Sequence, residues 1–179
     1  MRIIAGAARG RRLAAPPGSA TRPTADRARE GLFSAVMAEV EDARWLDLYA
    51  GSGAVGLEAL SRGASEVVLV ESHPRAVATI KENIARVGLD GARLEAAPVE
   101  RFLAGEPEPF DVVFADPPYA VPVEKTLHSL NDGGWLSPQA LIVVERATRS
   151  GEFSWPAGYV PVKARRYGEA TFWYGRLAA

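Results

Sequence analysis

The sequence lacks cysteine altogether and has only two histidines, His73 and His128, among its 179 residues. Without cysteine the chain can form no disulfide and no thiolate zinc site, and it has no cysteine nucleophile. The two histidines are not at a metal-ligand spacing, so we expect no metal site. The absence of cysteine fits a cytoplasmic protein, because disulfides belong mainly to oxidising compartments.

Long apolar runs, internal repeats and low-complexity stretches are also absent. No run of 18 apolar residues is present, so we expect no membrane span. Arginines rather than a long apolar segment follow the first residues, and we therefore expect no signal peptide. The length favours one domain of ordinary globular composition, which we expect to be a monomer.

The charge of the chain is unevenly distributed. Residues 1–30 contain seven arginines and two acids, a net charge of +5, whereas the whole chain carries −1. A basic segment on an acidic body suggests contact with a polyanion, although a solvated charged surface is the alternative. Two short apolar runs flank Arg9 and Gly10, which predicts a β-hairpin within residues 1–14. We expect a basic hairpin arm at 1–22 and the main domain at 23–179.

The rest of the chain alternates between apolar strands and amphipathic helices. Thr24 or Asp26 is expected to cap a helix that reaches about Val40. The expected strands are 44–49, 66–71, 92–96, 110–115 and 140–145, and the expected helices between them are 54–62, 74–87 and 123–131. Such alternation predicts a parallel sheet with helical crossovers. Segments 160–167 and 170–176 flank Gly168 and Glu169 and predict an antiparallel hairpin.

This pattern is the outline of an α/β, Rossmann-like methyltransferase fold with a mostly parallel seven-stranded sheet and a C-terminal antiparallel hairpin. Within it, residues 47–56 (DLYAGSGAVG) join the first strand to a helix. Gly51, Gly53 and Gly56 match the G-x-G-x-x-G fingerprint, and Glu71 follows about 20 residues later, where an acid can accept hydrogen bonds from ribose hydroxyls. The loop therefore predicts an adenosine-containing ligand.

Asp47 helps to identify that ligand. A carboxylate at the end of the first strand would repel the pyrophosphate of a dinucleotide, but it can hold the α-ammonium of a methionine moiety. This favours S-adenosylmethionine over a nicotinamide dinucleotide. The alternative is that Asp47 only orients the glycine loop through backbone hydrogen bonds.

Residues 116–119 (DPPY) directly follow the expected strand 110–115, at the edge of the sheet where ligands bind. Pro117 and Pro118 make a rigid loop that presents carbonyl oxygens. These oxygens and the Asp116 carboxylate can accept hydrogen bonds from an exocyclic amine, and Tyr119 can stack on a flat base. A purely structural turn is the alternative.

The sequence resembles the bacterial 16S ribosomal RNA guanine-N2 methyltransferases of the RsmD type over essentially its whole length. The matching segments are 2–6, 10–13, 16–18, 21–30, 32–33, 47–53, 56–64 and 116–119. Of these, the N-terminal segment around 21–30 is specific to the family, whereas the glycine loop and the DPPY loop are shared with many amino-methyltransferases.

The resemblance implies transfer of one methyl group from S-adenosylmethionine to N2 of a guanine in 16S rRNA, within an assembling or assembled small subunit. The implied catalytic residues are Asp116, Pro117, Pro118 and Tyr119. The implied cofactor-binding residues are Thr24, Asp47, Ala50, Gly51, Ser52, Gly53, Glu71, Ser72, Ala97 and Asp116. The expected RNA-binding residues are Arg2, Arg9, Arg11, Arg12 and Arg22.

The sequence departs from the family after the strand 92–96. Family members usually have an acid there, near the adenine amino group, whereas this chain has Ala97 and Pro98. The backbone of Ala97 or Val99 could take that role. Two other functions remain open at this stage: a DNA or protein amino-methyltransferase with the same loop, and a non-catalytic module that binds RNA or a nicotinamide cofactor.

Overall fold

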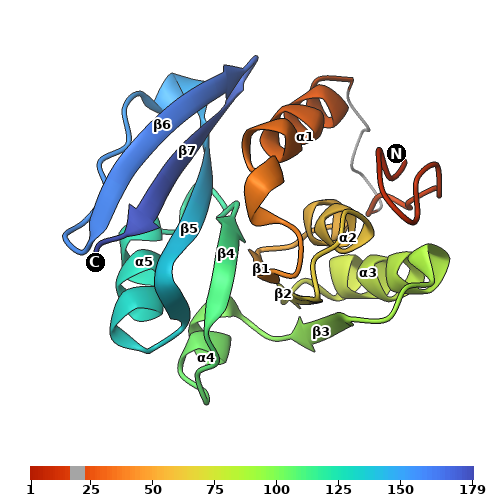
Figure 1. Cartoon of the computed structure of the whole chain (residues 1–179), viewed down its shortest axis with the longest axis horizontal. Coiled ribbons are helices and arrows are strands. Elements are labelled where there is room, and N and C mark those ends of the chain that lie inside the picture. The colour runs from red at the N-terminus through yellow and green to blue at the C-terminus, as the bar shows by residue number, and fades with distance from the viewer. Residues whose placement is uncertain (17–22) are drawn as a thin grey trace.

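The computed structural model describes residues 1–16 and 23–179. Seven strands form one sheet in the order β3-β2-β1-β4-β5-β7-β6 (Figure 1). The strands are β1 (Arg44–Leu48), β2 (Glu66–Glu71), β3 (Ala92–Ala96), β4 (Phe110–Ala115), β5 (Leu136–Ala147), β6 (Tyr159–Tyr167) and β7 (Ala170–Leu177). The first five pair in parallel, while β7 runs antiparallel to both β5 and β6.

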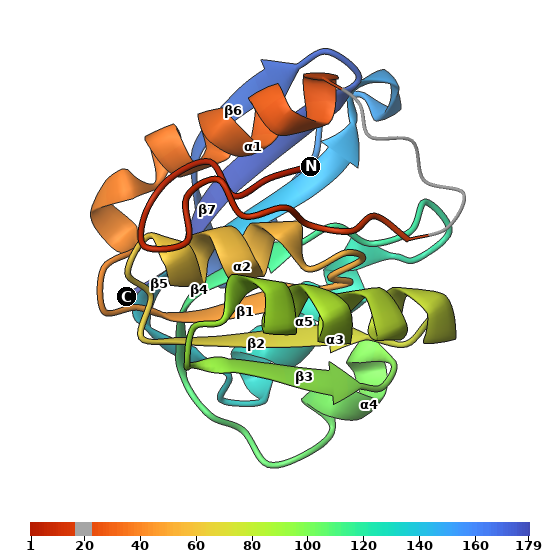
Figure 2. The same ribbon diagram turned by 90° about the vertical axis from the view of Figure 1, so that its right-hand side faces the viewer.

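Helices cover both faces of this sheet (Figure 2). They are α1 (Pro23–Ala35), α2 (Ala54–Ser61), α3 (Pro74–Val87), α4 (Val99–Leu103) and α5 (Val123–Asp132), with short 3₁₀ helices η1 (Met37–Glu39) and η2 (Thr148–Ser150). Side chains of α1, α2 and α3 form a core with one face, and those of α4 and α5 form a core with the other. Among the described residues, no helix is both long and apolar enough to cross a membrane.

The predicted α/β sheet with its antiparallel hairpin is confirmed, and most boundaries agree within two residues. Three predictions were wrong in detail. The first helix starts at Pro23 and ends at Ala35, so neither Thr24 nor Asp26 is its cap; proline suits a first helical position. β5 begins at Leu136, because the strand continues through an irregular pairing that Pro138 obscures in the sequence. The helix α4 was not predicted, because its five residues are too few to show a helical period in the sequence.

The expected N-terminal hairpin reverses direction as predicted, but a single bridge between Arg2 and Arg12 replaces a ladder. Backbone hydrogen bonds cross the hairpin from Ile3 to Arg11, from Gly10 to Ile3 and from Leu13 to Met1, while acceptors on the helices take other N–H groups. Glu58 accepts from Ile4 and Ala5, and Asn83 accepts from Ala14 at 2.7 Å. Buried Ile3, Ala8 and Leu13 anchor the segment. Residues 1–16 thus pack against the domain that we assign to 23–179.

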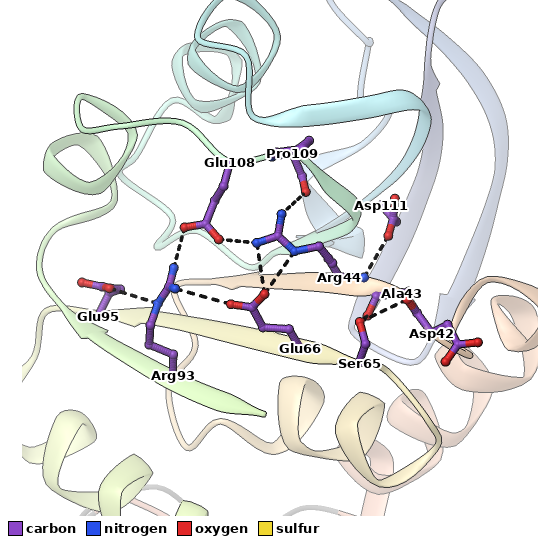
Figure 3. Close-up of polar contacts among 10 residues, drawn as sticks. All are labelled: Asp42, Ala43, Arg44, Ser65, Glu66, Arg93, Glu95, Glu108, Pro109 and Asp111. Carbon is purple, nitrogen blue, oxygen red and sulfur yellow. Dashed lines mark hydrogen bonds and ion pairs between the residues drawn. The ribbon is translucent and has the colours of Figure 1, made fainter. Parts of the chain in front are cut away.

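A network of charged side chains stabilises the edge of the sheet where β1, β2 and β3 begin (Figure 3). The Arg44 side chain donates to Glu66 at 3.1 Å and to the Pro109 carbonyl at 2.8 Å, and it pairs with Glu108. Arg93 forms ion pairs with Glu66 and with Glu108, at 3.4 Å and 2.6 Å. These guanidinium groups are therefore neutralised by glutamates within the fold.

Glu58 on α2 is fully buried and joins three segments. Its carboxylate accepts the N–H of Ile4 at 2.8 Å and of Ala5 at 3.0 Å, and it pairs with Arg62 at 2.8 Å. Arg29 on α1 lies 3.6 Å from it and donates to the Arg2 carbonyl. One carboxylate thus holds the N-terminal segment and α1 over α2.

We expect Glu58→Ala to lower the free energy of unfolding by about 3–5 kcal/mol, because it removes the buried partner of Arg29, which keeps only the half-exposed Asp26, and leaves the N–H groups of Ile4 and Ala5 without their acceptor. Glu82 forms an exposed ion pair with Arg86 one turn away, so Glu82→Ala should cost about 0.5 kcal/mol or less. Urea unfolding of both variants measures the two losses. Equal stability of the two variants would contradict the structural role of Glu58.

Candidate active site

A cavity of about 880 Å³ opens where β1, β4 and β5 end. This size is within the range of small-molecule sites. Of the residues expected at the site, those that line it are Asp47, Ala50, Gly51, Ser52, Asp116, Pro117 and Tyr119. Gly53, Glu71, Ser72, Ala97 and Pro118 are not among the lining residues. Thr24 lies in the first turn of α1, and its side chain is outside the described part of the structure.

The loop between β1 and α2 is held by Asp47 beneath it. The buried carboxylate accepts the N–H of Gly56 at 2.9 Å. A side chain at Gly56 has no room, because its Cβ would lie 2.6 Å from Leu69 Cδ2. Gly51 has open space but a φ of +60°, so its conformation rather than its surroundings requires glycine. Asp47 therefore orients the glycine loop and also lines the cavity.

Glu71 at the end of β2 makes a different contact from the one expected. Its carboxylate accepts backbone N–H groups of Gly51 at 2.8 Å and of Ser72 and His73 at 2.9 Å. The side chain thus ties the glycine loop to the turn after β2. Each carboxylate oxygen has about two lone-pair sites, so further acceptor capacity remains.

The DPPY loop follows β4 directly, and β4 pairs in parallel with β1, so it leaves the sheet next to the glycine loop. Pro117 is buried, whereas 80% of the Tyr119 surface is exposed. Both residues line the cavity together with Asp116. The geometry thus brings an aromatic face, a carboxylate and the glycine loop to one opening.

Glu145 at the end of β5 was not anticipated, and it completes an acidic cavity wall. β4 pairs with β5 so that Ala115 lies opposite Val144, which brings Asp116 and Glu145 to the same level. Asp116 can be reached from the cavity, but protein surrounds most of it, and this desolvation raises its pKa to about 6, against the opposing effect of Arg146. Desolvation and then Asp116 raise the pKa of Glu145 to about 8.

Burial also raises the pKa of Asp47 well above its usual range, against the hydrogen bond from Gly56. Asp116, Glu71 and Glu145 raise it further. Nearby carboxylates thus disfavour the ionised forms of Asp47 and Glu145, in addition to the larger effect of desolvation. A bound cation would relieve this repulsion.

Several other lining residues were missed. Tyr49 adopts a φ of +57°, which is uncommon outside glycine, and its hydroxyl lies 2.9 Å from Thr126 Oγ1. Tyr167 and Phe172 come from the C-terminal hairpin and make the far wall apolar. Of the missed residues, only Glu145 could have been expected from the sequence, since it ends an expected strand at the sheet edge where ligands bind.

The residues expected to bind RNA lie mostly outside the cavity. Arg2, Arg9, Arg11 and Arg12 are exposed on the N-terminal segment, and Arg22 lies outside the described residues. The Arg11 side chain donates to the Arg86 carbonyl at 3.1 Å. Ala97, where the family acid is missing, is half-buried, and its N–H donates to the Glu95 carbonyl at 3.1 Å.

Known proteins resemble this chain over most of its length. The family model described as Conserved hypothetical protein 95 matches residues 1–176. Ribosomal RNA small subunit methyltransferase D of Escherichia coli is 38% identical over 173 residues, which cover 96% of this chain and 87% of that protein. The protein of the same name from Haemophilus influenzae is 37% identical over 150 residues, covering 81% and 78%.

Solved structures give the same result. The Escherichia coli protein yhhF superimposes with a TM-score of 0.90 at 36% identity, covering 100% of this chain and 98% of that chain. This likeness confirms the predicted Rossmann-like methyltransferase fold, including the antiparallel strands at the C-terminus.

The raised pKa values of Asp116 and Glu145 predict that stability falls as pH rises. The folded state binds more protons than the unfolded state between about pH 4 and 8, so the free energy of unfolding decreases across this window. Glu145→Gln should be at least about 1 kcal/mol more stable than the wild type at pH 8, the equivalent of about one pKa unit, with little difference at pH 4.

Urea unfolding at several pH values without ligand measures this difference. Glu152→Gln removes one exposed acid outside the cavity and is the matched control. A Glu145→Gln variant that is less stable than the wild type at pH 8 would show that the carboxylate is a net stabiliser and that the electrostatic interpretation is wrong.

Proposed function

The chain belongs to the RsmD-type methyltransferase family described as Conserved hypothetical protein 95, and on this premise we propose that it transfers a methyl group from S-adenosylmethionine to N2 of a guanine in 16S rRNA. The observation that carries the proposal is the cavity shared by the glycine loop, Asp47 and the DPPY loop. Donor-binding and acceptor-binding residues thus face one space.

The acidic cavity supports this donor. S-adenosylmethionine, when bound, supplies a methyl group on a positively charged sulfonium and also carries an α-ammonium group. Asp47, Asp116 and Glu145 line the cavity, and burial disfavours their ionised forms, so a cationic ligand would offset their repulsion. The same carboxylates would repel the pyrophosphate of a nicotinamide dinucleotide. Ala50, Gly51 and Ser52 would contact the donor through the loop backbone.

The DPPY loop supports a planar amine as the acceptor. With a pKa of about 6, Asp116 is largely ionised at pH 7 and can accept a hydrogen bond from the guanine N2 amino group. The Pro117 carbonyl can accept a second. Exposed Tyr119 presents its ring to an unstacked base. Holding the amine in line with the methyl group contributes up to about 7–11 kcal/mol in favourable systems.

Ribosomal RNA as the substrate is supported by the names of the relatives and by the basic N-terminal segment. Arg2, Arg9, Arg11 and Arg12 are exposed and are our candidates for phosphate contacts, together with Arg22. These names suggest the RNA of the small ribosomal subunit as the substrate. It would be methylated either as naked rRNA or within an assembling or assembled subunit.

We expect Asp116→Ala to lower methyl transfer by about 100-fold or more, since the amine loses both its acceptor and its alignment. Affinity for S-adenosylhomocysteine, measured by calorimetry, should change little. Transfer is measured with labelled S-adenosylmethionine and purified small subunits, 16S rRNA, DNA and ribosomal protein. Full turnover of the variant would overturn the assignment of Asp116, whereas methyl transfer only to DNA or protein would overturn the substrate.

Tyr119 offers a test of base stacking. Tyr119→Ala should weaken productive RNA binding by about 1–3 kcal/mol, the usual value of one stacked base, and so raise KM. Tyr119→Phe keeps the ring and should restore KM, because the proposal assigns no role to the hydroxyl. Equal kinetics of the alanine variant and the wild type would exclude stacking at this position.

A further inference from the structure

The C-terminal part of the chain is a second basic region. Residues 146–179 contain six arginines or lysines and two acids, a net charge of +4, while residues 31–145 carry −10. Four of the six cations lie near the cavity end of the C-terminal hairpin: Arg146, Arg149, Arg165 and Arg166, here called the hairpin arginines. Positive charge is therefore not confined to the N-terminal segment.

Strand register places these residues beside the cavity. Arg146 on β5 pairs with Thr171 on β7, and Thr171 pairs with Arg166 on β6, so one row across the sheet has an arginine at each end. Arg165 pairs with Phe172, which lines the cavity. Arg146 and Arg149 line the cavity themselves. Arg146 and Arg149 thus lie at the cavity itself. Arg165 and Arg166 lie on β6 beside Tyr167, which lines the cavity; Arg165 is on the sheet face of Phe172, and Arg166 is on the other face.

The exposed members of this set donate to neutral acceptors or to solvent. Arg149, Arg165 and Arg166 are exposed. Arg165 donates to the Ala164 carbonyl at 2.8 Å and Arg166 to the Gly168 carbonyl at 3.2 Å, which are neutral acceptors. Within residues 1–16 and 23–179, none of the hairpin arginines forms an ion pair with a carboxylate, in contrast to Arg44 and Arg93 in Figure 3. Arg146 lies close enough to Asp116 to oppose the rise in its pKa.

In the N-terminal segment, Met1 lines the cavity, whereas the residues at the tip do not. Its tip is fixed by Ala7 and Ala8, which donate to the backbone and side chain of Ser61 at the end of α2. α2 starts beside the cavity at Ala54 and runs away from it for about 10 Å, at 1.5 Å per residue. Arg9 at this tip therefore lies far from the opening.

We propose that the hairpin arginines bind the phosphates on either side of the nucleotide whose base enters the cavity. This inference rests on the proposed function and assigns a surface to its RNA substrate. Guanidinium groups suit phosphate oxygens, because their donors match them in pairs. The N-terminal arginines then contact a more distant part of the same RNA.

The test uses the full chain and a 16S rRNA transcript. Arg149→Gln, Arg165→Gln and Arg166→Gln combined should reduce the slope of log K against log salt by about 2, because each phosphate neutralised on a single strand contributes about 0.7. Binding should weaken about tenfold or more, and KM for methyl transfer should rise. Arg146 is left unchanged because it lies beside Asp116.

Lys81→Gln, Arg101→Gln and Lys125→Gln combined make the matched control. These exposed cations lie on α3, α4 and α5, do not line the cavity, and their replacement removes the same total charge. The control should keep the wild-type slope. Thermal unfolding and S-adenosylhomocysteine affinity check that both triple variants are folded, and Arg165→Gln or Arg166→Gln alone should each lower the slope by about 0.7.

The possible outcomes distinguish a failure of this inference from a failure of the proposed function on which it rests. An unchanged slope and affinity in the hairpin variant would overturn the phosphate surface, even if the variant methylates rRNA. Wild-type protein that shows the expected slopes but transfers no methyl group to rRNA would leave the surface standing and remove the proposed function. The hairpin variant could also bind whole small subunits more weakly than the wild type does but bind the transcript equally well. That result would mean that the arginines contact a ribosomal protein, and it would also overturn the phosphate surface.

Discussion

Burial of carboxyl groups at one edge of the sheet is the constraint on which the site depends. Asp47, Glu71, Asp116 and Glu145 lie within two residues of the ends of β1, β2, β4 and β5, and the parallel arrangement brings these ends to the same edge. Each carboxyl group has a separate interaction or protonation state that lowers the free-energy cost of placing it here. Asp47 accepts the N–H of Gly56, Glu71 accepts three N–H groups, and the Asp116–Glu145 pair is partly protonated near neutral pH.

This arrangement links the stability of the glycine loop to the charge of the site. Asp47 and Glu71 hold the loop and the start of α2 at two points, Gly56 and Gly51. A side chain at Gly56 would collide with Leu69, so the close approach of α2 to the sheet requires glycine there. The buried Glu58 extends the same support to the N-terminal segment and α1, and residues of both line the cavity.

The sequence allowed prediction of the parts whose signals are local. Strands such as β2 and β4 are short apolar runs bounded by polar residues, and the glycine and DPPY loops follow them directly. Contacts made between distant segments were not predictable. In the N-terminal hairpin, the N–H groups of Ile4, Ala5 and Ala14 bond to Glu58 and Asn83, which lie more than 50 residues away. Glu145 looked like the end of a strand, and only the order of strands shows that β5 lies next to β4 and brings Glu145 to Asp116.

Both signs of charge line the cavity, and this limits what can enter. Asp47, Asp116 and Glu145 lie at the ends of the strands, whereas the exposed arginines Arg149, Arg165 and Arg166 lie on the C-terminal hairpin and the segment that leads to it. A polyanion is attracted to these exposed arginines and repelled by the carboxylates, so its phosphates remain with the arginines. A neutral, planar base meets no such barrier, and the exposed ring of Tyr119 offers it a surface at the entrance. A cation is favoured inside, next to Asp47 and Asp116. The electrostatics alone therefore suit a substrate that inserts one base while its backbone stays with the arginines, together with a cationic donor.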